Sequence, residues 1–174
     1  MVFIVLLNKY RTSNESQLTN GQSYKNLCNL MLTLLDHCYK QMDVITALKI
    51  MIFSNTFYLE IEQQRNEENE SKEFLQGGVG VHPIWHDLIF WEKAIYECIQ
   101  GELKDHKQQK TFDLTREIVF AKLSSLSLDM MSFDIPRNKI KDLITIFAKR
   151  YRLQQDQIHE IYERIENYKG TPFQ

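Results

Sequence analysis

The chain has 174 residues, of which 43% are hydrophobic and 25% are charged, a balance typical of a globular domain and not of a disordered segment. Its formal net charge is −2, without the basic excess that phosphate binding usually requires, so neither nucleic acid nor an anionic membrane is expected as the main partner. Only 6 glycines and 3 prolines are present, too few for the frequent turns of a sheet-rich fold. The totals predict one helical domain over residues 1–174.

The first seven residues, Met1 to Leu7, are apolar, but Asn8 and Lys9 end this run. A bilayer span needs about 20 apolar residues, and a signal peptide needs a basic start, so neither is predicted. We therefore expect no integral membrane segment here, and we expect the N-terminal residues to pack on the core. The polar stretch 11–23 is predicted to be a loop.

Two helices are predicted before the middle of the chain. From Tyr24 to about Gln41, apolar residues recur at intervals of three and four, which places them on one face of a helix. Asp43 is the expected N-cap of a second helix, which should reach about Leu59. This second helix is apolar on most sides, so it is predicted to be central.

The composition changes in the segment 60–80, a low-complexity polar and glycine-rich insert. Its polar run predicts a mobile loop or a solvated extension of the preceding helix. Gly77, Gly78 and Gly80 suggest a phosphate-binding loop at first, but no Gly-Lys-Ser/Thr follows and no strand is predicted before them. A flexible turn is therefore expected at these glycines.

Four further helices are expected after the insert. Pro83 is expected in the first turn of the first of these helices, and Thr111 is the expected N-cap of the second. The third helix begins after Pro136, and a short break at 152–155 separates it from the fourth. Their apolar stripes comprise Ile84, Leu88, Trp91, Ile95, Cys98 and Ile99; Val119, Leu123, Leu126, Met130 and Phe133; Ile140, Leu143, Ile144, Phe147 and Tyr151; and Ile158, Ile161, Tyr162, Ile165 and Tyr168. With a tail at 170–174, the predicted fold is all-α, an irregular bundle of six amphipathic helices, or seven with the N-terminal segment.

Three cysteines are present, Cys28, Cys38 and Cys98, and none of them forms a C-x-x-C pair. An odd number without such spacing argues against a disulfide framework or a zinc knuckle. We expect reduced, buried thiols in a cytoplasmic protein, and we expect Cys98 to be chemically inert on its apolar helix face.

His82 and His86 lie four residues apart, a spacing at which two histidines on one helix can bind zinc. Pro83 instead places His82 before the helix, where it is expected to cap the helix start while His86 is solvated. A third ligand would have to come from His37, His106, His159 or a distant carboxylate. We therefore expect no metal, no cofactor and no catalytic residue, and a metal-dependent hydrolase using His82 and His86 is the weakest alternative.

Basic residues gather between Lys139 and Arg152, and the helices on either side of the break at 152–155 could suggest a helix-turn-helix. Acidic residues such as Asp142 and Asp156 dilute this patch, so a mixed, solvated helix surface is expected, with no nucleic acid bound.

Trp85, Phe90 and Trp91 form an aromatic cluster. At helical spacing these three cannot share one narrow face. Either the helix is buried on several sides, which is the expected arrangement, or one of the aromatic residues is exposed to a partner as an interface anchor.

Two separated runs carry a family resemblance: Asn55-Thr56-Phe57-Tyr58, and His82-Pro83-Ile84-Trp85-x-x-Leu88-x-Phe90-Trp91-Glu92. Together they resemble the helical middle domain of the SET-binding-factor type, found in myotubularin-related pseudophosphatases and in small eukaryotic proteins of unknown activity. The stretches 118–120 and 130–133 are also similar, and the resemblance spans about residues 24–168. The insert at 60–80 departs from the family, and the first ten residues have no counterpart.

The resemblance implies a non-catalytic domain that accompanies modules acting on membrane traffic and on Rab-type GTPases. It provides no catalytic residue to carry over, and His82, Pro83, Trp85, Phe90 and Trp91 are expected to form a structural or partner-binding motif. The leading prediction is a non-enzymatic protein-interaction or scaffold domain, linked to membrane trafficking, that binds a protein through a helix face. The alternative is a structural subunit or segment of a large multiprotein assembly, whose apolar N-terminus docks onto neighbours.

Overall fold

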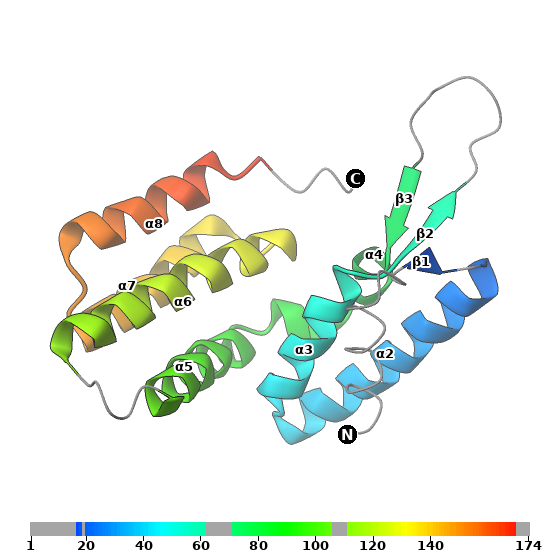
Figure 1. Cartoon of the computed structure of the whole chain (residues 1–174), viewed down its shortest axis with the longest axis horizontal. Coiled ribbons are helices and arrows are strands. Elements are labelled where there is room, and N and C mark those ends of the chain that lie inside the picture. Colours follow the sequence, from blue (N-terminus) through cyan, green and yellow to red (C-terminus); the bar gives the residue numbers. More distant parts are fainter. Residues whose placement is uncertain (1–16, 19, 62–70, 106–110, 170–174) are drawn as a thin grey trace. The chain divides into compact units, whose positions relative to one another are not determined.

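The structure, a computed structural model, describes residues 17–18, 20–61, 71–105 and 111–169 (Figure 1). Within these residues it has seven α-helices and one small three-stranded sheet, so the predicted all-α, multi-helix class is confirmed. No described helix is both long and apolar enough to cross a membrane. The predictions for 1–16, for the polar run 62–70 and for the tail lie outside the described residues.

The chain forms two compact units that meet in sequence between Ile84 and Trp85. The described residues up to Ile84 belong to unit 1, and the described residues from Trp85 onward belong to unit 2. Whether the two make up the single domain expected from the chain length stays a prediction.

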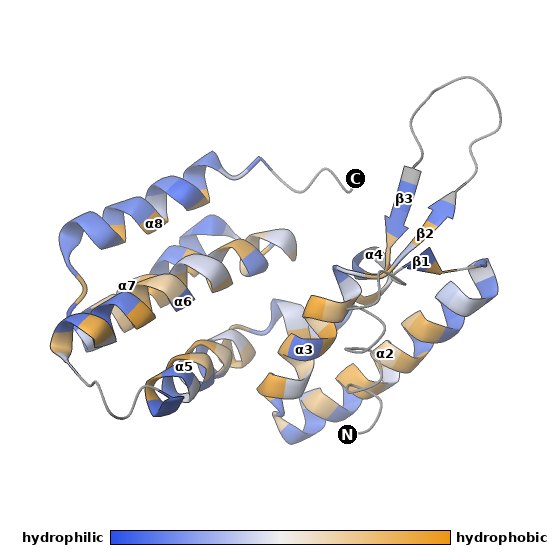
Figure 2. Ribbon diagram, viewed as in Figure 1, coloured by the Kyte–Doolittle hydropathy of each residue, from blue (hydrophilic) through white to orange (hydrophobic). Residues whose placement is uncertain are grey.

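Unit 1 begins with α2 (Gly21–Gln41) and α3 (Val44–Ser54), and both are capped by side chains. The Asn20 side chain accepts a hydrogen bond from the Ser23 N–H at 2.8 Å, and Asp43 accepts one from the Thr46 N–H at 3.1 Å, as predicted for Asp43. Buried residues lie on most sides of α3, which Figure 2 shows largely in hydrophobic colours. α3 packs against α2 and α4, while Ile45 and Ile52 leave one of its faces exposed, so its central position stays a prediction.

A small sheet follows α3, and the sequence did not predict it. α3 ends at Ser54 and not near Leu59, because the chain turns into β2 (Tyr58–Ile61). β2 pairs antiparallel with β3 (Ser71–Phe74) and parallel with β1 (Gln17–Leu18), in the order β1-β2-β3. Two loop predictions are therefore corrected. The loop predicted over 11–23 is wrong at Gln17–Leu18, which form β1, and from Gly21 on, where α2 begins. The loop or helix extension predicted after residue 60 is wrong at Ser71–Phe74, which form β3.

The predicted glycine turn is wrong for Gly77 and Gly78, which lie inside the short helix α4 (Leu75–Val79), whereas Gly80 does lie in a turn after that helix. Leu75 and Val79 are fully buried one helical turn apart and anchor α4 in unit 1. A Cβ added at Gly78 would lie 2.6 Å from Cys28 Sγ on α2, closer than side-chain atoms approach one another. Gly78 is therefore required for the close approach of α4 to α2, and not for flexibility.

We expect Gly78→Ala to lower the free energy of unfolding by about 1–3 kcal/mol, the usual cost of overpacking a filled site. Gly77→Ala is the matched control, because nothing lies within 4 Å of its Cβ position, and it should stabilise α4 by up to about 1 kcal/mol. Urea denaturation measures both. Cys28→Ala removes the clashing sulfur, so Gly78→Ala should lower the free energy of unfolding less in the Cys28→Ala background than in the wild type. An equal loss in both backgrounds would contradict the proposed clash.

Unit 2 consists of α5 (Leu88–Asp105), α6 (Phe112–Ser132), α7 (Arg137–Tyr151) and α8 (Gln155–Asn167). α6 packs against each of the other three helices (Figure 1). The Thr111 hydroxyl accepts a hydrogen bond from the Leu114 N–H at 3.2 Å, which confirms the predicted cap. Figure 2 shows α8 as a largely hydrophilic helix, and its buried residues, Ile161 and Ile165, belong to its predicted stripe.

The predicted helix start at Pro83 needs correction. Pro83–His86 form a 3₁₀ turn, and α5 begins only at Leu88. The Asp87 carboxylate accepts a hydrogen bond from the Ile89 N–H at 2.9 Å and satisfies a donor in the first turn of α5. Ile84 is buried before α5 and is not part of its face.

The predicted stripes of α6 and α7 agree with the observed core. All five predicted positions of the Thr111-capped helix are buried, and so are four of the five on α7, with Tyr151 half-buried. The buried residues are Val119, Leu123, Leu126, Met130, Phe133, Ile140, Leu143, Ile144 and Phe147. On α5 and α8 the agreement is partial, because several predicted positions are half-buried: Leu88, Cys98, Ile158, Tyr162 and Tyr168.

Candidate functional site

The three aromatic residues of the predicted motif are all fully buried in unit 2. The Trp85 ring stacks on Phe133 at 4.6 Å between ring centroids, and Phe90 meets Trp85 edge-on at 5.6 Å. The Trp91 indole N–H donates a hydrogen bond of 2.7 Å to the Trp85 backbone carbonyl. The expected core arrangement is therefore confirmed, and none of the three is exposed as an interface anchor.

His82 is anchored in unit 1, with 5% of its surface exposed. Its Nδ1 accepts a hydrogen bond from the Ile84 N–H at 3.1 Å, so the proton of the neutral ring lies on Nε2. Nε2 is 3.2 Å from Asp36 Oδ1 on α2, and the Tyr39 ring meets the imidazole edge-on. His82 thus caps the turn that follows it, as expected, and also joins that turn to α2.

The two predicted histidines do not form a shared site. Both ring nitrogens of His82 are engaged, whereas His86 is exposed, as expected. His37 and His159 are exposed as well, and His106 lies outside the described residues. Within the described ranges, no three His, Cys, Asp or Glu side chains are grouped so that they could hold a metal ion.

The motif bridges the sequence junction between the two units. Its first part, at His82 and Ile84, is held by contacts within unit 1, and its second part, from Trp85 to Trp91, is held by contacts within unit 2. These contacts give His82, Trp85, Phe90 and Trp91 a structural role, whereas Pro83 is exposed at the start of the 3₁₀ turn.

We expect His82→Ala to lower the free energy of unfolding by about 1–3 kcal/mol, because the buried Ile84 N–H loses its acceptor. The control, His86→Ala, removes an exposed ring four residues away and should change stability by less than about 0.5 kcal/mol. His82→Asn supplies a side-chain oxygen that can replace Nδ1 and should recover part of the loss. Equal effects of His82→Ala and His86→Ala in urea denaturation would contradict this role.

The cysteines are free thiols, and burial raises the pKa of each. The pKa of Cys38 reaches about 11, with the nearby Asp43 carboxylate adding to the effect of burial. Cys98 is half-buried and not fully buried as expected, and its pKa is raised although Lys122 opposes the shift. All three thiols are therefore protonated at neutral pH and are poor nucleophiles.

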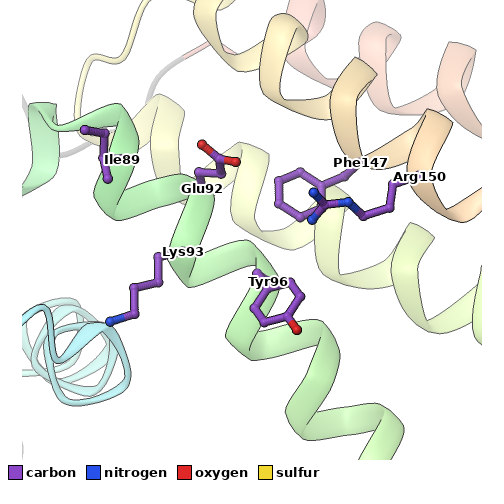
Figure 3. A pocket seen from close by; sticks show the side chains of 6 residues that line it. All are labelled: Ile89, Glu92, Lys93, Tyr96, Phe147 and Arg150. Atoms are coloured by element: carbon purple, nitrogen blue, oxygen red, sulfur yellow. The ribbon is translucent and has the colours of Figure 1, made fainter.

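A different part of unit 2 offers an open surface, a groove between α5 and α7. It has a volume of about 220 Å³ and is lined by Ile89, Glu92, Lys93, Tyr96, Phe147 and Arg150 (Figure 3). The four α5 residues follow the i, i+3, i+4, i+7 spacing of one helix face. Ile89 is 67% exposed and Tyr96 is 43% exposed, so this face presents apolar surface to solvent. We call it the α5–α7 groove.

The charge at the α7 side of the groove is not neutralised. The Arg150 guanidinium lies over the Phe147 ring at 5.5 Å, and neither Arg150 nor Lys149 forms an ion pair with the described residues. By contrast, Arg137 and Lys141 at the other end of α7 both pair with Glu166 of α8. Positive charge therefore remains available beside the apolar face.

Sequence reasoning did not identify this groove. It assigned the apolar residues of the 83–99 segment to a buried stripe and did not consider Ile89 and Tyr96, which lie outside that stripe. Their spacing of seven residues was the available signal, since two apolar residues two turns apart on the solvent side of a helix form an apolar face of their own. Phe147, in contrast, was predicted as core and also forms part of the groove wall.

Comparison of the chain with protein-family models, with curated proteins and with solved structures gave no match.

Proposed function

We propose that this chain is a non-enzymatic protein-interaction domain and that the α5–α7 groove of unit 2 is its binding surface. The observation that carries the proposal is the exposure of Ile89 and Tyr96 on one face of α5 beside the Phe147 ring. Exposed apolar surface beside a groove is a common mark of a protein-binding site. Large residues such as Tyr and Arg are also enriched among those that contribute most to binding energy.

The proposal extends to a cytoplasmic scaffold linked to membrane trafficking. The trafficking link is supported by the resemblance carried by the His82–Glu92 and Asn55–Tyr58 runs, and by nothing else. The cytoplasmic location is supported by the three cysteines, all of which are free thiols, as is usual in a reducing compartment. The alternative of a segment in a large assembly depended on the apolar residues from Met1 to Leu7, which lie outside the described residues.

Capture experiments with the full chain test the proposal. We compare the wild type, a groove variant carrying Ile89→Asp and Tyr96→Ala, and a control variant carrying Ile45→Asp and Ile52→Ala. Ile45 and Ile52 are also seven residues apart and are 38% and 46% exposed on α3, so the control removes similar apolar surface elsewhere. Thermal unfolding establishes that all three proteins are folded.

We expect a protein from a cell lysate to be retained by the wild type and by the control variant, and to be lost with the groove variant. Retention by all three proteins would place the interaction elsewhere and refute the groove as the binding surface. Retention of no protein by the wild type, together with turnover of a small-molecule substrate, would refute the interaction domain itself.

A further inference from the structure

We propose that the α5–α7 groove binds an amphipathic α-helix that carries acidic residues beside its apolar face. This inference rests on the proposed function, because it specifies the partner of the same surface. The shape, the length and the charge of the groove support it.

The shape of the groove fits a helix. α5 and α7 both pack on α6, and the groove lies between them. In helical bundles, the ridges of a further helix fill such a groove between two neighbours. Figure 3 shows Tyr96 of α5 and Phe147 of α7 on the two walls of this groove. Phe147 is fully buried, so the surface that a partner side chain would meet is that of Ile89 and Tyr96 on α5 and of Arg150 on α7.

The length of the apolar face fits two turns of a helix. Ile89 and Tyr96 are seven residues apart on α5, a separation of about 10 Å along the helix axis. A partner helix with apolar residues at i, i+3 or i+4, and i+7 covers the same distance, as in other helix-in-groove complexes. Ile146, one turn before Arg150 on α7, is also 47% exposed but lies outside the groove lining.

The charge of the groove favours an acidic partner. Arg150 lines the groove and Lys149 is next to it on the exposed side of α7, and neither is paired with a described carboxylate. Both residues lie in the last turn of α7, where they also complement the helix dipole. Glu92 is the only acidic residue in the lining. An aspartate or glutamate on the partner can therefore pair with Arg150, and this pairing also sets the orientation of the bound helix.

Selection from a displayed library of amphipathic helical peptides tests the inference. The peptides share leucines at i, i+4 and i+7 and differ only in whether glutamate, lysine or glutamine flanks the leucines. We expect the full wild-type chain to enrich the glutamate-flanked peptides. We expect Arg150→Glu to weaken their binding about tenfold at low salt and to shift the enrichment to lysine-flanked peptides. Arg150→Gln should remove the charge preference without reversing it.

Two controls make the result decisive. Ile89→Asp with Tyr96→Ala should abolish peptide binding, whereas the α3 variant Ile45→Asp with Ile52→Ala should not affect it. Enrichment without a charge preference, a preference for lysine flanks, or no enrichment would each overturn the inference. Binding of the chain to phosphatidylserine vesicles that depends on Arg150 and Ile146, without peptide enrichment, would assign the surface to a membrane and would also overturn it.

The outcomes separate the two proposals. If the groove variant loses its lysate protein but no acidic helix is enriched, the proposed function stands and the identity of the partner is wrong. If acidic helices are enriched but no lysate protein depends on the groove, the chemistry of the groove is as inferred and the proposed cellular role fails.

Discussion

Trp91→Ala is expected to lower the free energy of unfolding by about 3–5 kcal/mol, the usual cost of deleting a large buried aromatic side chain. Trp91 is fully buried against Trp85 and Phe90, and its indole N–H is bonded to a buried carbonyl. The substitution leaves a cavity and removes the hydrogen bond from the indole to the Trp85 carbonyl. Urea denaturation of the full chain measures the loss, and tryptophan fluorescence reports on Trp85 in the same experiment.

Two controls separate the cavity from other causes. Ile89→Ala changes α5 only two residues away, but Ile89 is 67% exposed, so stability should change by less than about 0.5 kcal/mol. Trp91→Phe keeps an aromatic ring in the core and removes the indole donor, and we expect an intermediate loss of about 1–3 kcal/mol. A loss of less than 1 kcal/mol in Trp91→Ala would contradict the role of the motif as core.

Asp129→Asn is expected to stabilise the protein at pH 7 by up to about 3 kcal/mol. Asp129 is half-buried on α6, and this burial raises the pKa of its carboxyl from 3.8 to about 6, so ionising the carboxyl at neutral pH costs folding free energy. No described residue donates a hydrogen bond to this carboxylate to offset that cost. Asparagine has nearly the same shape and carries no charge at any pH.

The direction of the Asp129 pKa shift determines how the free energy of unfolding changes with pH. Because the pKa of the folded state is raised, the contribution of Asp129 to stability is fully present below pH 3.8 and is lost as the pH rises through about 6. The wild type and Asp129→Asn should therefore be nearly equal in stability at pH 3.5 and should diverge between pH 4 and pH 7. Thermal unfolding over this range measures the divergence.

Asp142→Asn is the matched control, because Asp142 is exposed on α7 in the same unit. It should follow the wild type at every pH to within about 0.5 kcal/mol. A wild type that is more stable than Asp129→Asn at pH 7 would show that the carboxylate has a partner in the folded protein, and the prediction would be wrong.

Much of unit 2 could be predicted from the sequence because its helices are long and their signals are local. The cap at Thr111 is a property of neighbouring residues, and the stripes of α6 and α7 repeat over several turns. The burial of Trp85, Phe90 and Trp91 was predicted by the same reasoning, since three large aromatic residues on different sides of a short segment require cover on several sides.

The errors fall where the structure depends on residues distant in sequence. β2 exists because Tyr58 is paired with Phe74 across an intervening segment, and no local pattern marks such a pairing in strands of four residues. α4 forms in spite of its two glycines because buried Leu75 and Val79 hold it in unit 1. The glycine run therefore suggested a turn, although packing against α2 required a helix.

The sequence by itself determined the helical class, the caps at Asp43 and Thr111 and the residues that form most of the core, because these follow from helix periodicity and from hydrogen bonds between near neighbours. Only the tertiary structure decided which apolar residues remain in contact with water. Ile89 and Trp91 lie on the same helix and are both large and apolar, yet one is exposed and the other fully buried. The difference arises because Phe133, the residue that follows α6, joins the aromatic cluster around Trp91, while the described helices leave the groove beside Ile89 open.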